Sequence, residues 1–356
     1  MKKILFLASL VTLLMASCGD SFFDLEPASK VTIDKVYKTA SDYNVAVVGC
    51  YAKLQSQVNF YKECCEYRSD NMEVKAPTAG TQDRYDINHF EDKPSNGILS
   101  DYWANFNNNI YRCNLILDQI DGAQFDETLK KQYKGETMFI RALNYFNMYR
   151  VWGGVPATKH VVSAAEALKI ARYSDEQMFD LIAGDLKEIV DNNYLPEKYS
   201  ASETGRVTAN AAKALLGKVY LTFHKWNEAK NVLSQLIGKY SLLPSIGQVF
   251  DVNNKNNAEI IFAVHFNKEI VNEGHSYWYD PTQESFRKAI LDERQKEFPY
   301  EGHRWFDLVR MGYAKSVLAK QGLNIQDYQL LFPIPQTEIE KVGDSKILWQ
   351  NPGYDK

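Results

Sequence analysis

Ionisable side chains are most concentrated in residues 293–310, where acids and bases follow one another at short spacing. Two neighbouring carboxylates could form the acid pair with which glycosidases cleave a sugar linkage. Local ion pairing explains the spacing better, because residues three or four apart meet on one face of a helix. The pairs with this spacing are Arg294 with Glu297, Arg304 with Asp307, and Asp307 with Arg310. We therefore expect a structural role for these charges.

Other signals of catalysis are missing from the sequence. The six histidines are scattered, and no HExxH, GxSxG, Walker or GxGxxG motif occurs. No pair of cysteines has the spacing of a zinc site. Four cysteines could stay free or form one bridge: Cys50, Cys64, Cys65 and Cys113. The sequence predicts a protein that is not an enzyme, with no cofactor and no assigned metal ligand.

Residues 1–17 have the features of a signal peptide. Two lysines precede an apolar stretch from Ile4 to Met15, which is too short to cross a bilayer as a helix. Small residues then lead to Cys18 in a pattern typical of a bacterial lipobox. Cleavage before Cys18 and acylation of its thiol would give a membrane anchor, with residues 18–30 as a tether. An ordinary cleaved signal with an incidental cysteine is the alternative.

The composition is that of a folded domain, which we place at residues 31–356. Hydrophobic residues make up 45% of the chain and charged residues 24%. The net charge of -4 argues against a nucleic-acid partner, because phosphate binding needs clustered positive charge. The 22 Tyr, 18 Phe and 6 Trp exceed what the core alone needs and could also supply a binding surface for flat ligands.

Apolar spacing predicts a mainly helical domain. Residues 39–54 should form a helix that buries Val45, Val48, Ala52 and Leu54. Ser174 should cap a helix that ends near residue 190, with Gln177 completing a capping box. Further helices are expected at 98–120, 128–152, 208–224, 227–240 and 284–298. Residues 258–266 suggest a strand, and residues 68–97 and those from 330 onward suggest irregular loops.

The helix pair at 208–240 has the spacing of a tetratricopeptide repeat. Leu216, Gly217, Tyr220 and Ala229 stand at the positions where such repeats need a close helix approach. One repeat cannot bury its own face, so helices at 98–152 and 284–318 should stack against it. A generic helical hairpin is the alternative interpretation. Tryptophans in helical segments should belong to the core: Trp103, Trp152, Trp226 and Trp305.

Several segments together resemble the SusD/RagB family of outer-membrane lipoproteins, in a shortened form. They include residues 18–27, Tyr102-Trp103, Tyr111–Asn114, Glu136–Ala142, Trp152–Pro156, Gly205–Thr208, residues 290–310, Phe332–Pro335 and residues 350–354. This resemblance implies a helical-repeat scaffold with long loops and minor β structure. It also implies a surface lipoprotein of the outer membrane that passes a nutrient to a SusC-like, TonB-dependent barrel.

The chain departs from this family in one region. Tyr277, Trp278 and Tyr279 stand almost directly before Glu293 and Arg294, where family members usually carry more helices and loops. This shortening bears on the ligand-binding region more than on the fold.

Sugar capture needs flat aromatic faces together with hydrogen-bonding side chains, and two loops supply both. We expect Arg84 and Tyr85 in one loop, and Trp278 and Tyr279 in the other, to contact an oligosaccharide. Packing of these loops against the helical scaffold is the alternative for each residue. The alternative functions are capture of peptides or another nutrient, and a scaffold role in the transporter complex without a ligand.

Overall fold

The computed structural model describes residues 37–245, 248, 251, 254, 257–264, 291, 294–295 and 302–354. Residues 39–356 belong to one compact unit, which is the unit considered below. The predicted signal peptide (1–17), the predicted tether (18–30) and Cys18 lie outside the described residues, as do Trp278 and Tyr279. Among the described residues, none of the helices is both long and apolar enough to span a bilayer.

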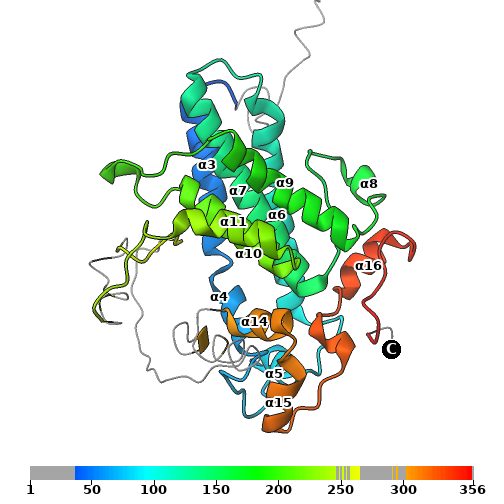
Figure 1. Ribbon diagram of the computed structural model, residues 1–356. Helices are drawn as coiled ribbons and strands as arrows, with labels where there is room; N and C mark the ends of the chain where they lie inside the picture. The colour runs from blue at the N-terminus through cyan, green and yellow to red at the C-terminus, as the bar shows by residue number, and fades with distance from the viewer. Residues whose placement is uncertain are drawn as a thin grey trace, which may run out of the picture. The chain divides into compact units, whose positions relative to one another are not determined.

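Stacked helices form the framework of this unit (Figure 1). Its six helices are α3 (Ala40–Gln55), α6 (Gly97–Ile120), α7 (Glu127–Trp152), α9 (Asp175–Asp191), α10 (Ala209–Thr222) and α11 (Trp226–Leu233). Helix α3 packs on α6 and α7, α9 packs on α7, and α10 packs on both α9 and α11. The predicted helical-repeat fold is confirmed. Within the described residues α9 supplies the main packing for α10, and α7, which lies in the predicted partner region 98–152, also contacts it.

Capping residues set the ends of these helices. Asn96 caps α6 and Asp126 caps α7, each through a side-chain oxygen that accepts backbone N–H bonds. The predicted capping box of Ser174 and Gln177 begins α9. α7 ends at Gly153, whose φ of 73° favours glycine. A Cβ on Gly154 would lie 1.9 Å from the Tyr173 carbonyl oxygen, so this turn also needs its second glycine.

Close packing between α10 and α11 confirms the repeat-like role of Gly217. A Cβ at this position would lie 2.3 Å from Leu233 Cδ2, so any larger residue would push the helices apart. Ala229 is buried in the same contact, as the repeat spacing predicts. Trp226, at the start of α11, is 53% exposed, so its predicted core position is wrong. The other three helical tryptophans are buried as expected.

The predicted face of α3 is confirmed at Leu54, which is buried, and wrong at the two valines. Val45 is 68% exposed and Val48 is 48% exposed. The buried residues of the helix are instead Tyr43, Val47, Cys50 and Leu54, which recur at the same helical period. Periodicity identified the helix, but two faces fitted the pattern and the contact with α6 selects the one that bears the tyrosine.

Three predictions for irregular or extended segments are also corrected. Residues 257–264 contain no strand. Within the described ranges, β structure is limited to one isolated bridge between Pro156 and Arg172. The predicted loop 68–97 contains α5 (Gln82–His89), and the tail contains α16 (Gln336–Val342). Polar sequences formed these two short helices because tertiary contacts, rather than an apolar stripe, stabilise them.

Buried polar bonds join the long helices through residues of the family-like segments. Arg141 on α7 donates to both carboxylate oxygens of Asp185 on α9, at 2.8 and 3.0 Å. Its third nitrogen donates to Asn114 Oδ1 on α6 and to the Lys159 carbonyl, each at 2.8 Å. The buried charges of Arg141 and Asp185 therefore pair with each other, and the bonds of Arg141 connect α6, α7 and α9.

A second buried carboxylate joins α3, α7 and the segment before α10. Glu136 accepts hydrogen bonds from the hydroxyl of Tyr51 and from the guanidinium of Arg206, at 2.8 and 3.0 Å. Tyr199 and Gln132 also donate to it. Because Arg206 and Glu136 stand in separate family-like segments, this contact explains why both segments carry a charge.

The charged run near residue 304 is structural, with one pairing changed. Arg304 binds Asp70 at 2.6 and 2.7 Å rather than the predicted Asp307. Asp307 instead binds Arg294 at 2.6 Å and Arg310 at 2.9 Å. The pairing of Asp307 with Arg310 is thus confirmed, and Glu297 lies outside the described residues. The correction arises because Asp70 belongs to a distant segment that no local spacing could reveal.

The late part of the chain returns to the end of α7. After α14 (Arg304–Met311) and α15 (Ala314–Leu318), Phe332 and Asn351 bond to the last turn of α7, the Phe332 N–H donating to the Val151 carbonyl at 2.9 Å. The Asn351 amide donates to the carbonyl oxygens of Trp152 and Phe332, at 3.1 and 2.7 Å. The four described cysteines are free thiols, and all are buried.

Candidate ligand-binding face

Helix α5 is held in place by the contacts of its buried side chains. Asn88 accepts a hydrogen bond from the Val74 backbone and donates to the carbonyl oxygens of Tyr67 and Met72. Its amide therefore ties the chain before α5 to the helix itself. Asp86 and Ile87 are buried beside it, while the other side of α5 stays partly exposed. The helix is thus a fixed platform with one accessible face.

Phe90 fixes the end of this platform. It adopts a left-handed conformation, with φ of 60° and ψ of 32°, and its N–H closes the last turn of α5. A non-glycine residue in this region costs about 1–3 kcal/mol unless its surroundings enforce it. Here the ring is buried against Trp305 and beneath the guanidinium of Arg68. Packing of the side chain holds the strained backbone.

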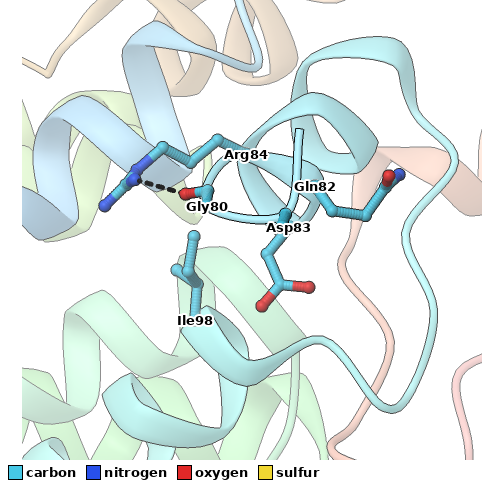
Figure 2. Close-up of a pocket in the computed structure, with 6 residues that line it drawn as sticks. Gly80, Gln82, Asp83, Arg84 and Ile98 are labelled. Carbon is cyan, nitrogen blue, oxygen red and sulfur yellow. Dashed lines mark hydrogen bonds between the residues drawn. The ribbon is translucent and has the colours of Figure 1, made fainter. Parts of the chain in front are cut away.

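Arg84 projects from the accessible face beside a cavity of about 200 Å³. Its Nε donates to Glu63 Oε1 at 2.8 Å, and its Nη1 donates to the Gly80 carbonyl at 3.3 Å. Figure 2 shows this bond to Gly80, while the Asp83 side chain extends toward the start of α6, where Ile98 lies. The Arg84 side chain is still 37% exposed, so part of the guanidinium faces solvent.

Tyr85 and His89 form a stacked aromatic pair on the same helix. Their rings stack with centroids 3.8 Å apart and an angle of 19° between planes. They are four residues apart, so one helical turn brings them together. His89 Nδ1 lies 3.1 Å from the Tyr85 carbonyl oxygen, which fixes the imidazole over the phenol ring. Both side chains are partly exposed.

Two groups in this region, the Arg84 guanidinium and the Tyr102 hydroxyl, keep their protons at ordinary pH. The hydrogen bond to Glu63 raises the pKa of Arg84, so its guanidinium stays protonated. Burial raises the pKa of Tyr102, whose hydroxyl donates to Glu63 Oε2 at 2.7 Å. Such a face can bind a ligand through hydrogen bonds and stacking. Within the described ranges, no three His, Cys, Asp or Glu side chains converge as they would around a metal ion.

The structure describes two of the four residues that the sequence predicts as ligand contacts. Arg84 and Tyr85 both lie on α5, at the cavity and beside it, whereas Trp278 and Tyr279 lie outside the described residues. Sequence reasoning missed the stacking role of His89. The spacing of Tyr85 and His89 was visible, but it predicts contact only once residues 82–89 are known to be helical.

Family comparisons agree with this framework. Residues 21–221 match the model of a family described as starch-binding and associating with the outer membrane. Residues 267–354 match the model of the SusD family. The chain belongs to the SusD family. This SusD-family protein is 26% identical over 265 residues to SusD-like protein P25 of Formosa agariphila, covering 71% of the chain and 50% of that relative.

Solved structures show the same fold. A laminarin-binding SusD-like protein superposes with a TM-score of 0.75 at 20% identity, covering 89% of this chain and 100% of that chain. Surface glycan-binding protein A of Bacteroides thetaiotaomicron, solved with laminarihexaose, gives a TM-score of 0.71 at 17% identity, with coverage of 87% and 99%. The chain spans between 50% and 66% of the length of four curated relatives.

Proposed function

We propose that this SusD-family protein captures a glycan at the bacterial surface and delivers it to a TonB-dependent outer-membrane transporter. The stacked pair of Tyr85 and His89 beside Arg84 carries this proposal, because an exposed aromatic plane next to fixed donors suits a sugar. The laminarin-binding neighbours, which share the fold, support a glycan as the ligand class.

A sugar ring has an apolar face of C–H groups and a rim of hydroxyls. The apolar face would lie on an outer face of the stacked Tyr85–His89 pair, where burial of flat surface from water favours contact. Hydroxyls would reach the exposed part of the Arg84 guanidinium and the side chains of Gln82 and Asp83, which line the adjoining cavity. This arrangement binds and orients a ligand, and the proposal includes no catalytic step. Trp278 and Tyr279 are proposed as further contacts.

Anchoring and delivery are further parts of the same proposal. Acylation of Cys18 would hold the protein on the outer membrane, with residues 1–17 removed and residues 18–30 as a tether to the domain at 31–356. A SusC-like barrel would receive the ligand. Support comes from the family, whose description places it at the outer membrane. Metabolic labelling with palmitate tests the anchor: wild type should be labelled and Cys18→Ser should not.

Glycan retention is the direct test of capture. The purified domain is run through gels that contain laminarin, starch or another neutral polysaccharide, and its retardation is measured. Tyr85→Ala should weaken retention about tenfold or more, because a stacked aromatic in a binding site contributes about 1–3 kcal/mol. Tyr111→Ala is the matched control, since this tyrosine is 46% exposed on α6 and is not part of the α5 face.

Equal retardation of wild type and Tyr85→Ala would contradict the α5 site and place the glycan elsewhere on the protein. Two other outcomes would contradict glycan capture itself. If no polysaccharide retards the wild type, yet it co-purifies with a barrel, the scaffold role is favoured. Binding of peptides but not sugars would favour capture of another nutrient.

A further inference from the structure

A second and larger cavity, of about 490 Å³, lies between α7, α10 and α14. None of the residues that line it belongs to α5 or to the cavity beside Arg84. Part of its wall is apolar, with Leu221, Phe306 and Leu331 among the lining residues. The family-like charges at 294–310 face the same space, so the cavity combines apolar walls with a charged end.

Two of the cations at the charged end form no ion pair within the described residues. Arg150 on α7 and Lys218 on α10 line it together with two further arginines, Arg294 and Arg310. Arg294 and Arg310 both bind the carboxylate of Asp307, at 2.6 and 2.9 Å. Among the described lining residues the other acid is Asp175, which lies at the Tyr149 hydroxyl. Arg150 and Lys218 are therefore the two cations that form no described ion pair.

Arg150 has unused hydrogen-bonding capacity here. Its guanidinium is stacked between two aromatic rings, with its central carbon 4.5 Å from the Phe146 centroid and 3.8 Å from that of Phe306. Its Nη2 donates to Asn147. Its Nε is buried and has no hydrogen-bond partner among the described residues. A buried donor in this state costs about 1–3 kcal/mol, which an acceptor entering the cavity would offset.

Lys218 lies beside this guanidinium without a described carboxylate to pair it. Its Nζ is 3.3 Å from His303 Nδ1. Burial, with the neighbouring cations, lowers the pKa of His303 to about 2, so the imidazole is neutral and accepts this bond. Burial and the charge of Arg150 lower the pKa of Lys218 to about 7. The lysine is therefore half-charged near neutral pH.

We propose that this cavity binds the oxyanion group, carboxylate or sulfate, of a small ligand such as an acidic sugar. The oxyanion would lie between the Lys218 ammonium and Arg150, supplying negative charge to two cations that form no ion pair within the described residues. The body of the ligand would lie along Phe306 and Leu221. This site is separate from the α5 face and does not depend on glycan capture there.

The lysine gives the binding a defined pH dependence. The charged and titratable groups that face Lys218 are Arg150, Cys65, Arg294, His303 and Asp307. The thiol of Cys65 stays neutral because burial raises its pKa. Protonated Lys218 is the competent form, so an anion should bind more tightly as the pH falls below 7 and bind with proton uptake. Apparent affinity scales with the protonated fraction, which predicts about a tenfold loss between pH 6 and pH 8.

Calorimetry and thermal unfolding with three probes test the proposal: galacturonate, sodium sulfate and neutral galactose, at one fixed ionic strength. Galacturonate or sulfate should bind at pH 6 and raise the Tm of the protein. At pH 8 the affinity measured by calorimetry should be about tenfold lower, and the rise in Tm should be smaller. Galactose should have no effect at this site. A response to galacturonate alone identifies a carboxylate ligand, and a response to sulfate alone identifies a sulfate ester.

Lys218→Met is the decisive variant, because methionine has nearly the same shape and removes a buried charge rather than leaving one unpaired. This variant should fold, show no rise in Tm with either anion at pH 6, and still be retarded by neutral polysaccharide in gels. Lys230→Met is the control, since it removes the same charge from an exposed position on α11. The proposal is overturned if neither anion shifts the wild-type Tm at pH 6, or if Lys218→Met responds as wild type does.

Discussion

Two arginine–carboxylate pairs in this protein have the same chemistry and different surroundings. Arg141 and Asp185 join α7 to α9, with side chains that are 5% and 1% exposed. Arg84 and Glu63 join α5 to η2 (Lys62–Glu66), a π-helical turn, and the arginine is 37% exposed. In the first pair the guanidinium donates to a carboxylate, an amide and a carbonyl, all inside the protein. In the second, part of the guanidinium faces water.

The comparison shows how one residue type can serve either the framework or a ligand. A buried arginine such as Arg141, with four hydrogen bonds inside the protein, is engaged by the framework, so its removal acts on stability. A half-exposed arginine that is held in place by one carboxylate keeps a donor free and is fixed in position, which favours ligand binding. The surroundings of the pair, rather than its chemistry, decide between the two roles.

The largest expected effect is that of breaking the buried pair. Arg141→Met leaves Asp185 as a buried carboxylate without its main partner, and such changes cost about 3–5 kcal/mol. Urea unfolding followed by circular dichroism measures this as a lower midpoint. A loss below about 1 kcal/mol would show that water reaches Asp185 and that the framework role is wrong.

Overpacking of the repeat-like contact should have the next largest effect. In Gly217→Ala the new methyl group meets Leu233, and such insertions cost about 1–3 kcal/mol. Thermal unfolding of this variant should show a lower Tm, with polysaccharide retention unchanged below the transition. The control is Ala214→Ser, which adds one atom elsewhere on α10. Gly238→Ala is less suitable, because the positive φ of Gly238 would strain an alanine. An unchanged Tm for Gly217→Ala would mean that α11 can shift freely.

The smallest stability effect is expected at the α5 face. Arg84→Lys keeps a cation near Glu63 but loses the fork of donors, and partly exposed pairs contribute about 0–1 kcal/mol. Retention on neutral polysaccharide should nevertheless fall, because the free donor is displaced. Stability is measured by urea unfolding and binding by gel retardation on the same preparation. A large stability loss with unchanged retention would reverse the comparison and make Arg84 a framework residue.

Local sequence signals predicted the framework well. The capping box at Ser174 and the small residues at Gly217 and Ala229 depend on neighbours within one or two turns, so spacing alone reveals them. The partner of Arg304 could not be found in this way, because Asp70 is 234 positions away in the sequence. Contacts of this length follow from the assembled fold and have no local pattern.

The α5 face was harder to predict for a related reason. Ile87 is the only large aliphatic residue that the helix buries, so no apolar stripe distinguishes its sequence from a loop. Hydrogen bonds of Asn88 to distant backbone groups hold the helix instead. Arg84 and Tyr85 were recognised from residue type, whereas their placement on one rigid helix beside His89 required the structure.

The amide of Asn351 spans 199 positions of the chain to reach the end of α7. Helices α6, α7 and α9 can assemble from contacts that are closer in sequence before this bond forms. The Trp152 carbonyl oxygen gains this partner only when residue 351 packs against the end of α7. Closing so long a loop is entropically slow, and it should be a late event in folding.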